Sequence, residues 1–593
     1  MSYWERQLNR RRFMAGVSAL GVVASSTLIG CGGSSSKQTN SSDLVTRPKD
    51  SSSGAKRGGT YLSRTAVDEN NIDPSTTPRG AGLGGPGRGA YSRLLREKEA
   101  PGGTAPPEFL GDLAESWESS NGGLQLTVKL RKDAKFDPRA PTTGRNVTAD
   151  DVLFSFKRLS TQSSYRGQLS NEADPSAPVL ALQKVDDYTL NFKLAFPWVP
   201  LQATLANGTL FVVPTEGEDK VNLKTETRGS GPWLLNEHQG SAYFKWRKNP
   251  NWFRQNEALY LDGYDEPIIV ETAAAEAQFR AKRIYNHIPN RSSVLTLTRE
   301  SPGIQLYQEP ISGSRVVFFG LKGNPQFKDV RVRRAISMVV DRELYSRVDQ
   351  EADLFAAGGI HLDINLDSHV PEYYKSAGLW LDPRGNALGE GAKYFQHDVA
   401  EAKKLMAAAG YASGFDAPGP FRSGDAEAEK RESIVAEWIG QIGIRLKLEV
   451  VDYQNVWLQS IYVAPPDDKG NWAGLASHHA PLPQFDPGIS LYVRYHSRGA
   501  FTASRFWDDG QKEIDSIIEG TLREFDENKR KALFREAQRK MAVYMSAVAF
   551  GHTTLDYDLV WPWVQNWGFT KSYYDKTGNV PFERVWLDES KMS

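Results

Sequence analysis

The sequence predicts a mixed α/β fold with more than one folding unit. Helix-like and strand-like patterns of apolar residues alternate along the body of the chain, which favours α/β layers over a β-sandwich or a helical bundle. The clearest example is a helical stripe from Ile434 to Ile442, which Gly443 closes and an alternating apolar run at 444–450 follows. At 593 residues, the chain also exceeds what one hydrophobic core usually organises.

In the first half of the chain, two elements carry the clearest local signals. Apolar residues occupy every second position of 124–130, which predicts a strand with one buried face. Thr148 is followed three residues later by Asp151, and this capping pair predicts a helix start that leads into 152–156. The glycine-dense stretch 79–89 is predicted to be a loop, because a phosphate cradle would need a closing Lys-Ser or Lys-Thr that is absent there.

The second half contains three further helix-like stripes. The first spans 332–344 and follows Asp329, which is a candidate N-cap. The second spans 399–409, and Gly410 is well placed to end it. The third lies at 533–541. These helices, with strand-like runs between them, complete the alternation on which the α/β prediction rests.

The charge balance argues against one class of partner. Lys plus Arg and Asp plus Glu both total 72, so the formal net charge is zero and nothing electrostatic favours nucleic acid. Hydrophobic residues make up 39% of the chain and include 15 tryptophans, which is ample material for a core. We therefore expect a soluble globular body that does not bind nucleic acid.

The only cysteine, Cys31, lies at the end of an apolar run near the amino terminus. Residues 9–14 place positive charge before this run, and the run itself is too short and too rich in Gly and Ser for a membrane-spanning helix. This order predicts a signal peptide over residues 1–30. Arg10-Arg11-x-Phe13-Met14 resembles a twin-arginine export signal, with a general arginine-rich signal as the alternative.

The residues that lead to Cys31, Leu-Ile-Gly-Cys, resemble the lipobox of bacterial lipoproteins. This resemblance implies that the cysteine is acylated and becomes the first residue of the mature protein. Residues 31–57 contain almost no large apolar side chains and are predicted to form a flexible tether. The expected location is therefore outside the cytoplasm, with the body anchored to the membrane through the lipid on Cys31.

The chain lacks the common catalytic and metal-binding motifs. It contains no His-Glu-x-x-His and no Gly-x-Ser-x-Gly, and a single cysteine cannot form Cys-x-x-Cys. Of its nine histidines only His478 and His479 are adjacent, and adjacent residues of a strand point to opposite faces, so the pair is poorly placed to chelate one metal. We predict no catalytic residue, no metal site, no cofactor and no enzymatic activity.

Several segments, in order, resemble the extracytoplasmic solute-binding proteins of family 5, the dipeptide- and oligopeptide-binding type that serves ABC importers. The most specific match is Leu-Ala-Glu-Ser-Trp-Glu at 113–118, followed by 130–136 and 147–156. Further segments that resemble family elements lie at 185–189, 229–233, 249–252, 327–342, 409–411 and 441–444. The resemblance covers nearly all of the chain from Gly58 on.

The resemblance implies a two-lobed, periplasmic-binding-protein-like α/β fold of type II, in the large class with an extra subdomain in lobe one. The matched motifs place lobe one at 58–313 plus 550–593 and lobe two at 314–549. The implied function is the substrate-binding component of an ABC importer. It would capture a peptide-like or other small solute by closure of the lobes and deliver it to the permease subunits. The expected assembly is a monomer.

The family's cleft segment corresponds to residues 472–487 and commonly reads Trp-x-x-Asp-Tyr-x-Asp-Pro. In the family, the first aspartate pairs with the amino terminus of a peptide ligand. On the simplest alignment Pro483 takes that position, and proline has neither a charge nor a backbone donor. Asp486 matches the end of the pattern, and it either takes over the charged role or caps the next helix.

The site hypothesis combines this segment with the loop after the first strand. The residues expected to bind the ligand are Asn70, Asn71, Trp472, Ser477, His478, His479, Gln484 and Asp486. Because of Pro483, and because 281–285 lacks the family's Gly-Glu-Ile-Asp-like turn, other interpretations stay open. One keeps the fold but changes the ligand to a glycoside, opine, nickel chelate or haem. The other is a cell-surface enzyme or a sensor that reports ligand to a receptor.

Overall fold

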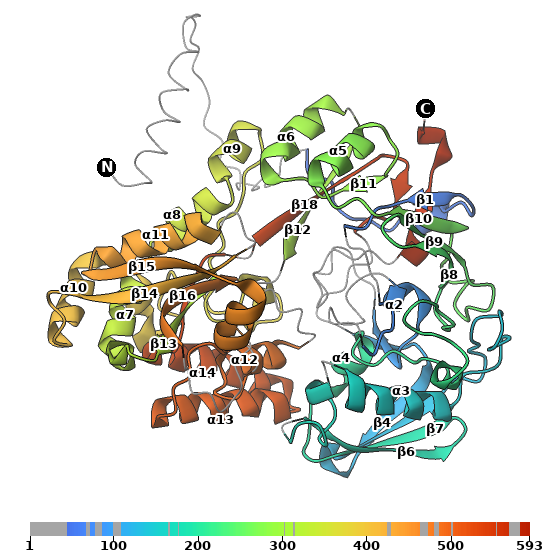
Figure 1. Ribbon diagram of the computed structural model, residues 1–593, viewed down its shortest axis with the longest axis horizontal. Coiled ribbons are helices and arrows are strands. Elements are labelled where there is room, and N and C mark those ends of the chain that lie inside the picture. The colour runs from blue at the N-terminus through green and yellow to red at the C-terminus, as the bar shows by residue number, and fades with distance from the viewer. Residues whose placement is uncertain are drawn as a thin grey trace, which may run out of the picture.

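The computed structural model arranges the chain in several groups of helices and sheets (Figure 1). The residues that it describes are 44–66, 71–76, 86–98, 108–163, 166–175, 177–301, 303–311, 315–423, 428–462, 472–479, 486–499, 502–552, 554–568 and 582–592. Their buried hydrophobic side chains form three clusters, and each cluster is covered by its own set of elements.

The first cluster, which we call core A, includes Tyr61, Trp246 and Leu559 and lies between two sheets. One sheet has the order β1-β10-β9-β8, in which β1 is parallel to β10 and the other pairs are antiparallel. The other has the order β11-β18-β12 and is antiparallel. The elements are β1 (Thr60–Leu62), α2 (Pro86–Ala90), β8 (Trp233–Gln239), β9 (Tyr243–Lys248), β10 (Gly263–Pro267), α5 (Thr272–Arg280), β11 (Asn286–His287), α6 (Arg291–Glu300), β12 (Gln305–Ile311), α9 (Ala352–Ala357), β18 (Thr554–Val560), β19 (Val564–Gln565) and β20 (Trp586–Leu587).

The second cluster, core B, includes Val128, Val152 and Phe192 and lies under an antiparallel sheet of order β4-β5-β7-β6. Helix α3 packs against β6 of this sheet. The elements are β2 (Leu95–Glu97), β3 (Phe109–Gly111), β4 (Ala114–Ser120), β5 (Gln125–Leu130), α3 (Ala149–Gln162), β6 (Val179–Asp186), β7 (Thr189–Leu194) and α4 (Leu201–Ala206). Figure 1 shows this group next to the strands of core A.

The third cluster, core C, includes Phe319, Ile336 and Trp438. Its sheets have the orders β16-β13-β17 and β14-β15, and β14 packs against β16. Helices cover these sheets, as Figure 1 shows at its left side. The elements are β13 (Arg315–Leu321), α7 (Val330–Met338), α8 (Arg342–Asp349), α10 (Val399–Ala408), β14 (Phe415–Arg422), α11 (Ala428–Gly440), β15 (Ile444–Val451), β16 (Ala473–His479), α12 (Pro487–Tyr495), α13 (Asp509–Arg523), α14 (Glu527–Tyr544) and β17 (Val548–Phe550).

Two strand connections join core A to core C. The chain passes from β12 of the first to β13 of the second, and it returns from β17 to β18. Figure 1 shows β12 and β18 between the helices of core C and the sheets at the opposite side. The two connections lie close together in the sheets. The two parts of the molecule are therefore joined at the place where these strands cross between them.

Local sequence signals explain where several elements begin and end. Thr148 and Asp151 form the predicted capping box of α3. Asp329 caps α7, as predicted, because its side chain accepts the amide of Arg331. Gly443 has a φ of +84°, a backbone conformation that favours glycine. The backbone of Gly414 lies close against Gly443, and β14 and β15 start side by side directly after these two glycines.

Three of the predicted boundaries were wrong. The stripe at 332–344 is two helices, α7 and α8, because Asp341 accepts the amide of Leu344 and starts a new helix. Residues 86–89 of the predicted glycine loop belong to α2, and the rest of that stretch lies outside the described residues. Leu124 lies before β5 and is 42% exposed, so the buried alternation begins only at Leu126.

Candidate functional site

Trp472, the first residue of the predicted cleft segment, is buried at the edge of β16. Its indole ring lies against Gly320 of β13, where a Cβ atom would meet the ring at 2.5 Å. The indole Nε1 donates a hydrogen bond to the carbonyl of Ala503 at 2.9 Å. The polar atom of this side chain is therefore used inside core C.

Ser477 lies near the end of β16 and faces the buried Glu432 of α11. The Ser477 hydroxyl donates to Oε1 of Glu432, and its amide donates to Oε2 at 3.3 Å. Burial raises the pKa of Glu432 to about 7, although Ser477 and Arg315 oppose this shift. Ser477 is thus hydrogen-bonded to a carboxyl group, that of Glu432, whose pKa lies near neutral pH. This carboxyl group lies beside the predicted cleft segment.

Asp486 follows the loop after β16 and opens α12. Its Oδ1 accepts the amide of Gly488 at 2.7 Å, which confirms the predicted N-cap. The same oxygen lies 2.6 Å from Nη2 of Arg530 on α14, so its charge is paired. These contacts fix the direction in which α12 leaves the cleft segment.

Asn71 lies in a different part of the molecule, beside core A. Its Nδ2 donates to Oγ1 of Thr76 at 3.0 Å and its Oδ1 accepts the amide of Asp73 at 3.1 Å, so the side chain organises a turn. Asn70 and Gln484 lie outside the described residues. His478 and His479 are described only through their backbone in β16, where they are paired with Val316 and Arg315 of β13.

The structure thus places Trp472, Ser477 and Asp486 in one group around β16 and α12, with Asn71 apart from them. Neighbouring side chains that sequence reasoning missed complete this group. Glu432 is 45 residues away from Ser477 in the chain, so no local motif could have linked the two. Only the packing of α11 against β16 brings them together.

A cluster of charged side chains lies where the chain crosses between cores A and C. Arg291 of α6 donates to the carbonyl of Asp349 at 2.5 Å and to that of Leu555 at 3.3 Å. His552, between β17 and β18, lies 3.4 Å from Oδ2 of Asp349. Burial acts to raise the pKa of Asp349, but His552, Arg291, Arg315 and Arg431 together outweigh it, so the pKa is lowered. This cluster ties α6 of one part to α8 of the other.

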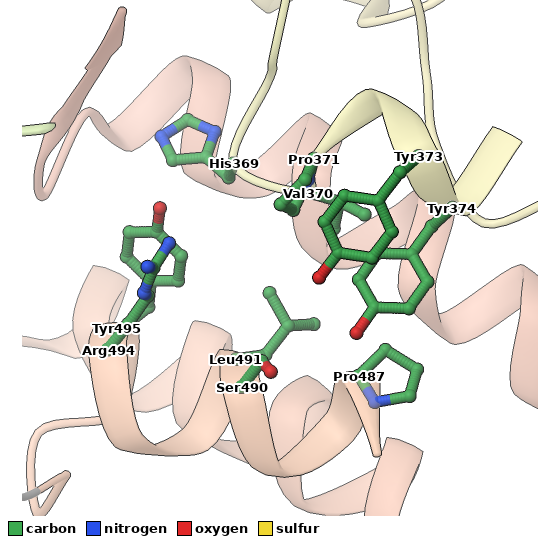
Figure 2. Close-up of a pocket in the computed structure, with 10 residues that line it drawn as sticks. All are labelled: His369, Val370, Pro371, Tyr373, Tyr374, Pro487, Ser490, Leu491, Arg494 and Tyr495. Atoms are coloured by element: carbon green, nitrogen blue, oxygen red, sulfur yellow. The ribbon is translucent and has the colours of Figure 1, made fainter. Parts of the chain in front are cut away.

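A small pocket lies between α12 and residues 369–374 (Figure 2). It holds about 20 Å³ of space for water-sized molecules. Its lining comes from α12 and from the segment that precedes and includes the turn at Glu372–Lys375. The lining residues are His369, Val370, Pro371, Tyr373, Tyr374, Pro487, Ser490, Leu491, Arg494 and Tyr495.

Two classes of feature are absent from the part of the chain that the structure describes. It contains no group of three or more His, Cys, Asp or Glu side chains that could hold a metal ion. Within the same residues, no helix has both the length and the apolar character needed to cross a bilayer.

Comparison with known sequences identifies the family. The profile of the bacterial extracellular solute-binding proteins, family 5 (middle region), matches residues 108–482, which is well over half of the chain. The chain belongs to this family. The family match confirms the resemblance found in the sequence motifs, and the protein is a solute-binding protein of the ABC transporter class.

Individual relatives agree with this assignment over most of the chain. Heme-binding protein A of Haemophilus influenzae is 23% identical and covers 87% of this chain and 90% of its own length. The dipeptide-binding protein of Escherichia coli is also 23% identical, over 78% of this chain and 84% of its own length.

A solved structure establishes the fold class. The periplasmic binding protein DppA from Helicobacter pylori, in complex with the peptide STSA, has a TM-score of 0.66 at 20% identity and covers 90% of this chain and 98% of its own. This solute-binding protein therefore has the predicted type II periplasmic-binding-protein fold.

Proposed function

We propose that this solute-binding protein captures a small solute between two lobes outside the cytoplasmic membrane and delivers it to the permease of an ABC importer. Lobe one would consist of residues 58–313 and 550–593, with cores A and B, and lobe two of residues 314–549, with core C. The observation that carries this proposal is the pair of connections, β12 to β13 and β17 to β18, that join the two parts. The family profile covers the first of these connections. Two short crossings allow the parts to rotate as rigid bodies.

Capture by closure follows from the energetics of such a joint. A solute that contacts both lobes gains contacts only in the closed form, so it shifts the balance between open and closed forms. A shift from mostly open to mostly closed needs a preference of about 5 kcal/mol for the closed form. The cluster of Arg291, Asp349 and His552 spans the crossing and would set the resting balance.

We propose a peptide-like solute as the first candidate ligand. Relatives whose names state dipeptide binding, and a structural neighbour that holds a peptide, support this choice. The second candidate is a non-peptide ligand such as haem. It is favoured by Pro483, which supplies no carboxylate for a peptide amine, and by the name of the Haemophilus relative.

The proposed delivery route starts at the amino terminus, which lies outside the described residues. A signal peptide over 1–30, with twin-arginine character, would direct export. Acylation of Cys31 would then anchor the protein through the tether at 31–57, and the body would act as a monomer without catalysis. Changing Cys31→Ser should move the protein from the membrane fraction to the soluble one and abolish labelling by radioactive palmitate. Unchanged labelling would contradict the anchor.

A thermal-shift panel tests the proposed function. The full chain is heated with dipeptides, tripeptides, opines, glycosides, a nickel chelate and haemin, and turnover of each compound is followed. A true ligand at about 100 times its Kd should add about 2.7 kcal/mol of stability without being converted. Stabilisation by none of these compounds, or conversion of the one that binds, would contradict the proposal.

Two paired variants test the site hypothesis once the ligand is known. His478→Ala and Gln484→Ala should weaken its binding at least several-fold. The matched controls are His397→Ala and Gln441→Ala, which change exposed residues of the same types on core C and should bind normally. Equal affinity of all four variants would remove His478 and Gln484 from the site.

A further inference from the structure

Arg494, in the last turn of α12, is buried and only 5% exposed. Its Nε atom is buried and has no hydrogen-bond partner. No carboxylate of the described residues forms an ion pair with this guanidinium. Burial of a charge without a partner is costly, so such a side chain is retained in folded proteins mainly where an ion or ligand completes its surroundings.

Two further buried polar atoms line the pocket, the hydroxyl of Tyr495 and Nδ1 of His369, and both side chains are almost fully buried. Nδ1 of His369 has no hydrogen-bond partner, whereas the hydroxyl of Tyr495 has the guanidinium of Arg494 as its neighbour. The rings of His369 and Tyr495 lie edge to face with their centroids 5.4 Å apart. Figure 2 shows His369, Arg494 and Tyr495 at one end of the pocket, with Tyr373, Tyr374 and Pro487 at the other. The unpartnered atoms are therefore grouped at one end.

The charges around this end favour an anion. Nε2 of His369 lies 3.2 Å from the carbonyl of Ala547, and burial lowers the pKa of this histidine to about 4, so it is neutral at pH 7. Burial raises the pKa of Tyr495 to about 12, and the charge of Arg494 and its hydrogen bond to the phenol oppose this rise, whereas Asp367 adds to it. Oδ1 of Asp367 accepts the amide of Glu372 at 2.8 Å. A guanidinium has five N–H donors, so Arg494 can contact both the Tyr495 hydroxyl and a group in the pocket.

The size of the pocket limits what it can hold. A space of about 20 Å³ for water-sized molecules admits one small species, such as a halide ion or a single carboxylate group. A guanidinium and a phenolic hydroxyl are both donors, which suits an anion and not a cation.

We propose that the pocket between α12 and residues 369–374 binds one small monovalent anionic group, held by the guanidinium of Arg494 and the hydroxyl of Tyr495. The group is either a free ion, such as a halide or formate, or a carboxylate of the transported solute. If the group is a free ion, the site is independent of transport. If the group is a carboxylate of the transported solute, the assignment rests on the proposed function, and a competition experiment separates the two sources.

The test measures thermal unfolding of the full chain in sodium bromide, sodium formate or sodium gluconate at one ionic strength. Bromide and formate should raise the midpoint temperature in a saturable way relative to gluconate, which is too large to enter. Arg494→Met should remove this difference. Tyr495→Phe deletes only a hydroxyl, so it tests the site even if the first variant does not fold, and about ten times more bromide should be needed for half-saturation. Equal responses of wild type and Tyr495→Phe, or no response of wild type, would overturn the proposal.

Matched controls lie on or beside the same helix. Tyr492→Phe and Arg498→Met change residues that do not line the pocket, and both proteins should respond like wild type. Crystals grown in bromide should show anomalous scattering in contact with Arg494, and a pocket without this peak would also overturn the proposal.

The source of the anionic group is decided by competition. If bromide weakens binding of the transported solute, and Arg494→Met weakens it too, the group is a carboxylate of that solute. If solute affinity is the same in wild type and variant while the bromide response is lost, the group is a free ion. Both outcomes support the site. If the proposed transport function fails but the bromide response persists, the anion site still stands.

Discussion

Buried arginines in two regions of core C differ in how their charge is accommodated. Arg333 and Arg342, on α7 and α8, donate to a full set of oxygens. Arg333 reaches the carbonyls of Met545, Phe327, Lys328 and Tyr544 at 2.8–2.9 Å, and Arg342 reaches those of Ala549, Ser337 and Phe395 at 3.0 Å and the hydroxyl of Ser337 at 2.7 Å. Arg494 on α12 has no comparable set of acceptors.

This difference separates a structural use of arginine from a binding use. A guanidinium whose donors all meet backbone carbonyls joins segments that are far apart in the chain, and burial lowers the pKa of Arg342 to about 9 even so. A guanidinium beside an open pocket keeps donors for something that is not part of the chain. The two kinds of site should therefore respond in opposite ways to removal of the charge.

The largest expected effect is at the saturated site. Arg342→Met removes the buried hydrogen bonds to the carbonyls of Ser337, Phe395 and Ala549, so the free energy of unfolding should fall by about 3–5 kcal/mol. Urea unfolding measures this loss. The control Arg347→Met removes an exposed ion pair with Asp353 and should cost less than about 1 kcal/mol. Equal losses in the two variants would break the comparison.

Glu432 is the buried acid of the same core and provides a pH test. Its unfolded pKa is about 4.3, whereas in the folded protein it is about 7. Between these values the folded protein holds a proton that the unfolded chain has lost, so the contribution of Glu432 to stability falls as pH rises through this window.

The variant Glu432→Gln isolates this contribution. The stability of wild type minus that of the variant should fall by on the order of 3 kcal/mol between pH 4.5 and 7.5, because the variant lacks the titration. The buried His369 and His552 are common to both proteins, so their opposite pH dependence cancels. Urea unfolding across this pH range measures the difference, and a constant difference would show that Glu432 does not titrate as described.

A smaller effect is expected at the start of α12. Asp486→Asn keeps an oxygen for the amide of Gly488 but loses the charge that pairs with Arg530. Asn is a good N-cap, so only the pairing is removed, and the free energy of unfolding should fall by about 1–2 kcal/mol. Asp526→Asn changes an exposed cap of α14 and serves as the control, with a loss under about 1 kcal/mol. A loss at Asp486 no larger than at Asp526 would show that the pair with Arg530 contributes nothing.

The smallest effect is expected at the open site. In gluconate, without small anions, Arg494→Met should change the free energy of unfolding by less than about 1 kcal/mol, or raise it, because an unpaired buried charge is replaced by an apolar chain. Urea unfolding of both proteins in gluconate tests this. A loss as large as that of Arg342→Met would mean that Arg494 is as structural as the saturated arginines.

The local part of this fold could be predicted from the sequence. Thr148, Asp329 and Asp486 are caps whose partners lie within three residues, so their role is visible in the chain itself. The apolar stripe that lies mostly in α11 and the alternating run that forms β15 were predictable for the same reason, because their periodicity is local. The family motifs supplied the two-lobed architecture.

The site could be predicted only in outline. Strand β13 pairs with residues 473–479 and 548–550, which are far away in the chain, and no periodicity indicates such partners. The pairing of Ser477 with Glu432 and the position of Arg494 beside His369 depend on this packing. The boundary between α7 and α8 was missed because their apolar stripes continue through Asp341.

Small-angle X-ray scattering of the full chain, titrated with the solute that the thermal-shift panel identifies, tests the central claim most directly. Capture by closure of two lobes predicts that the radius of gyration falls as the solute saturates the protein, with the same midpoint as binding. A solute that binds while the radius of gyration stays constant would contradict the account.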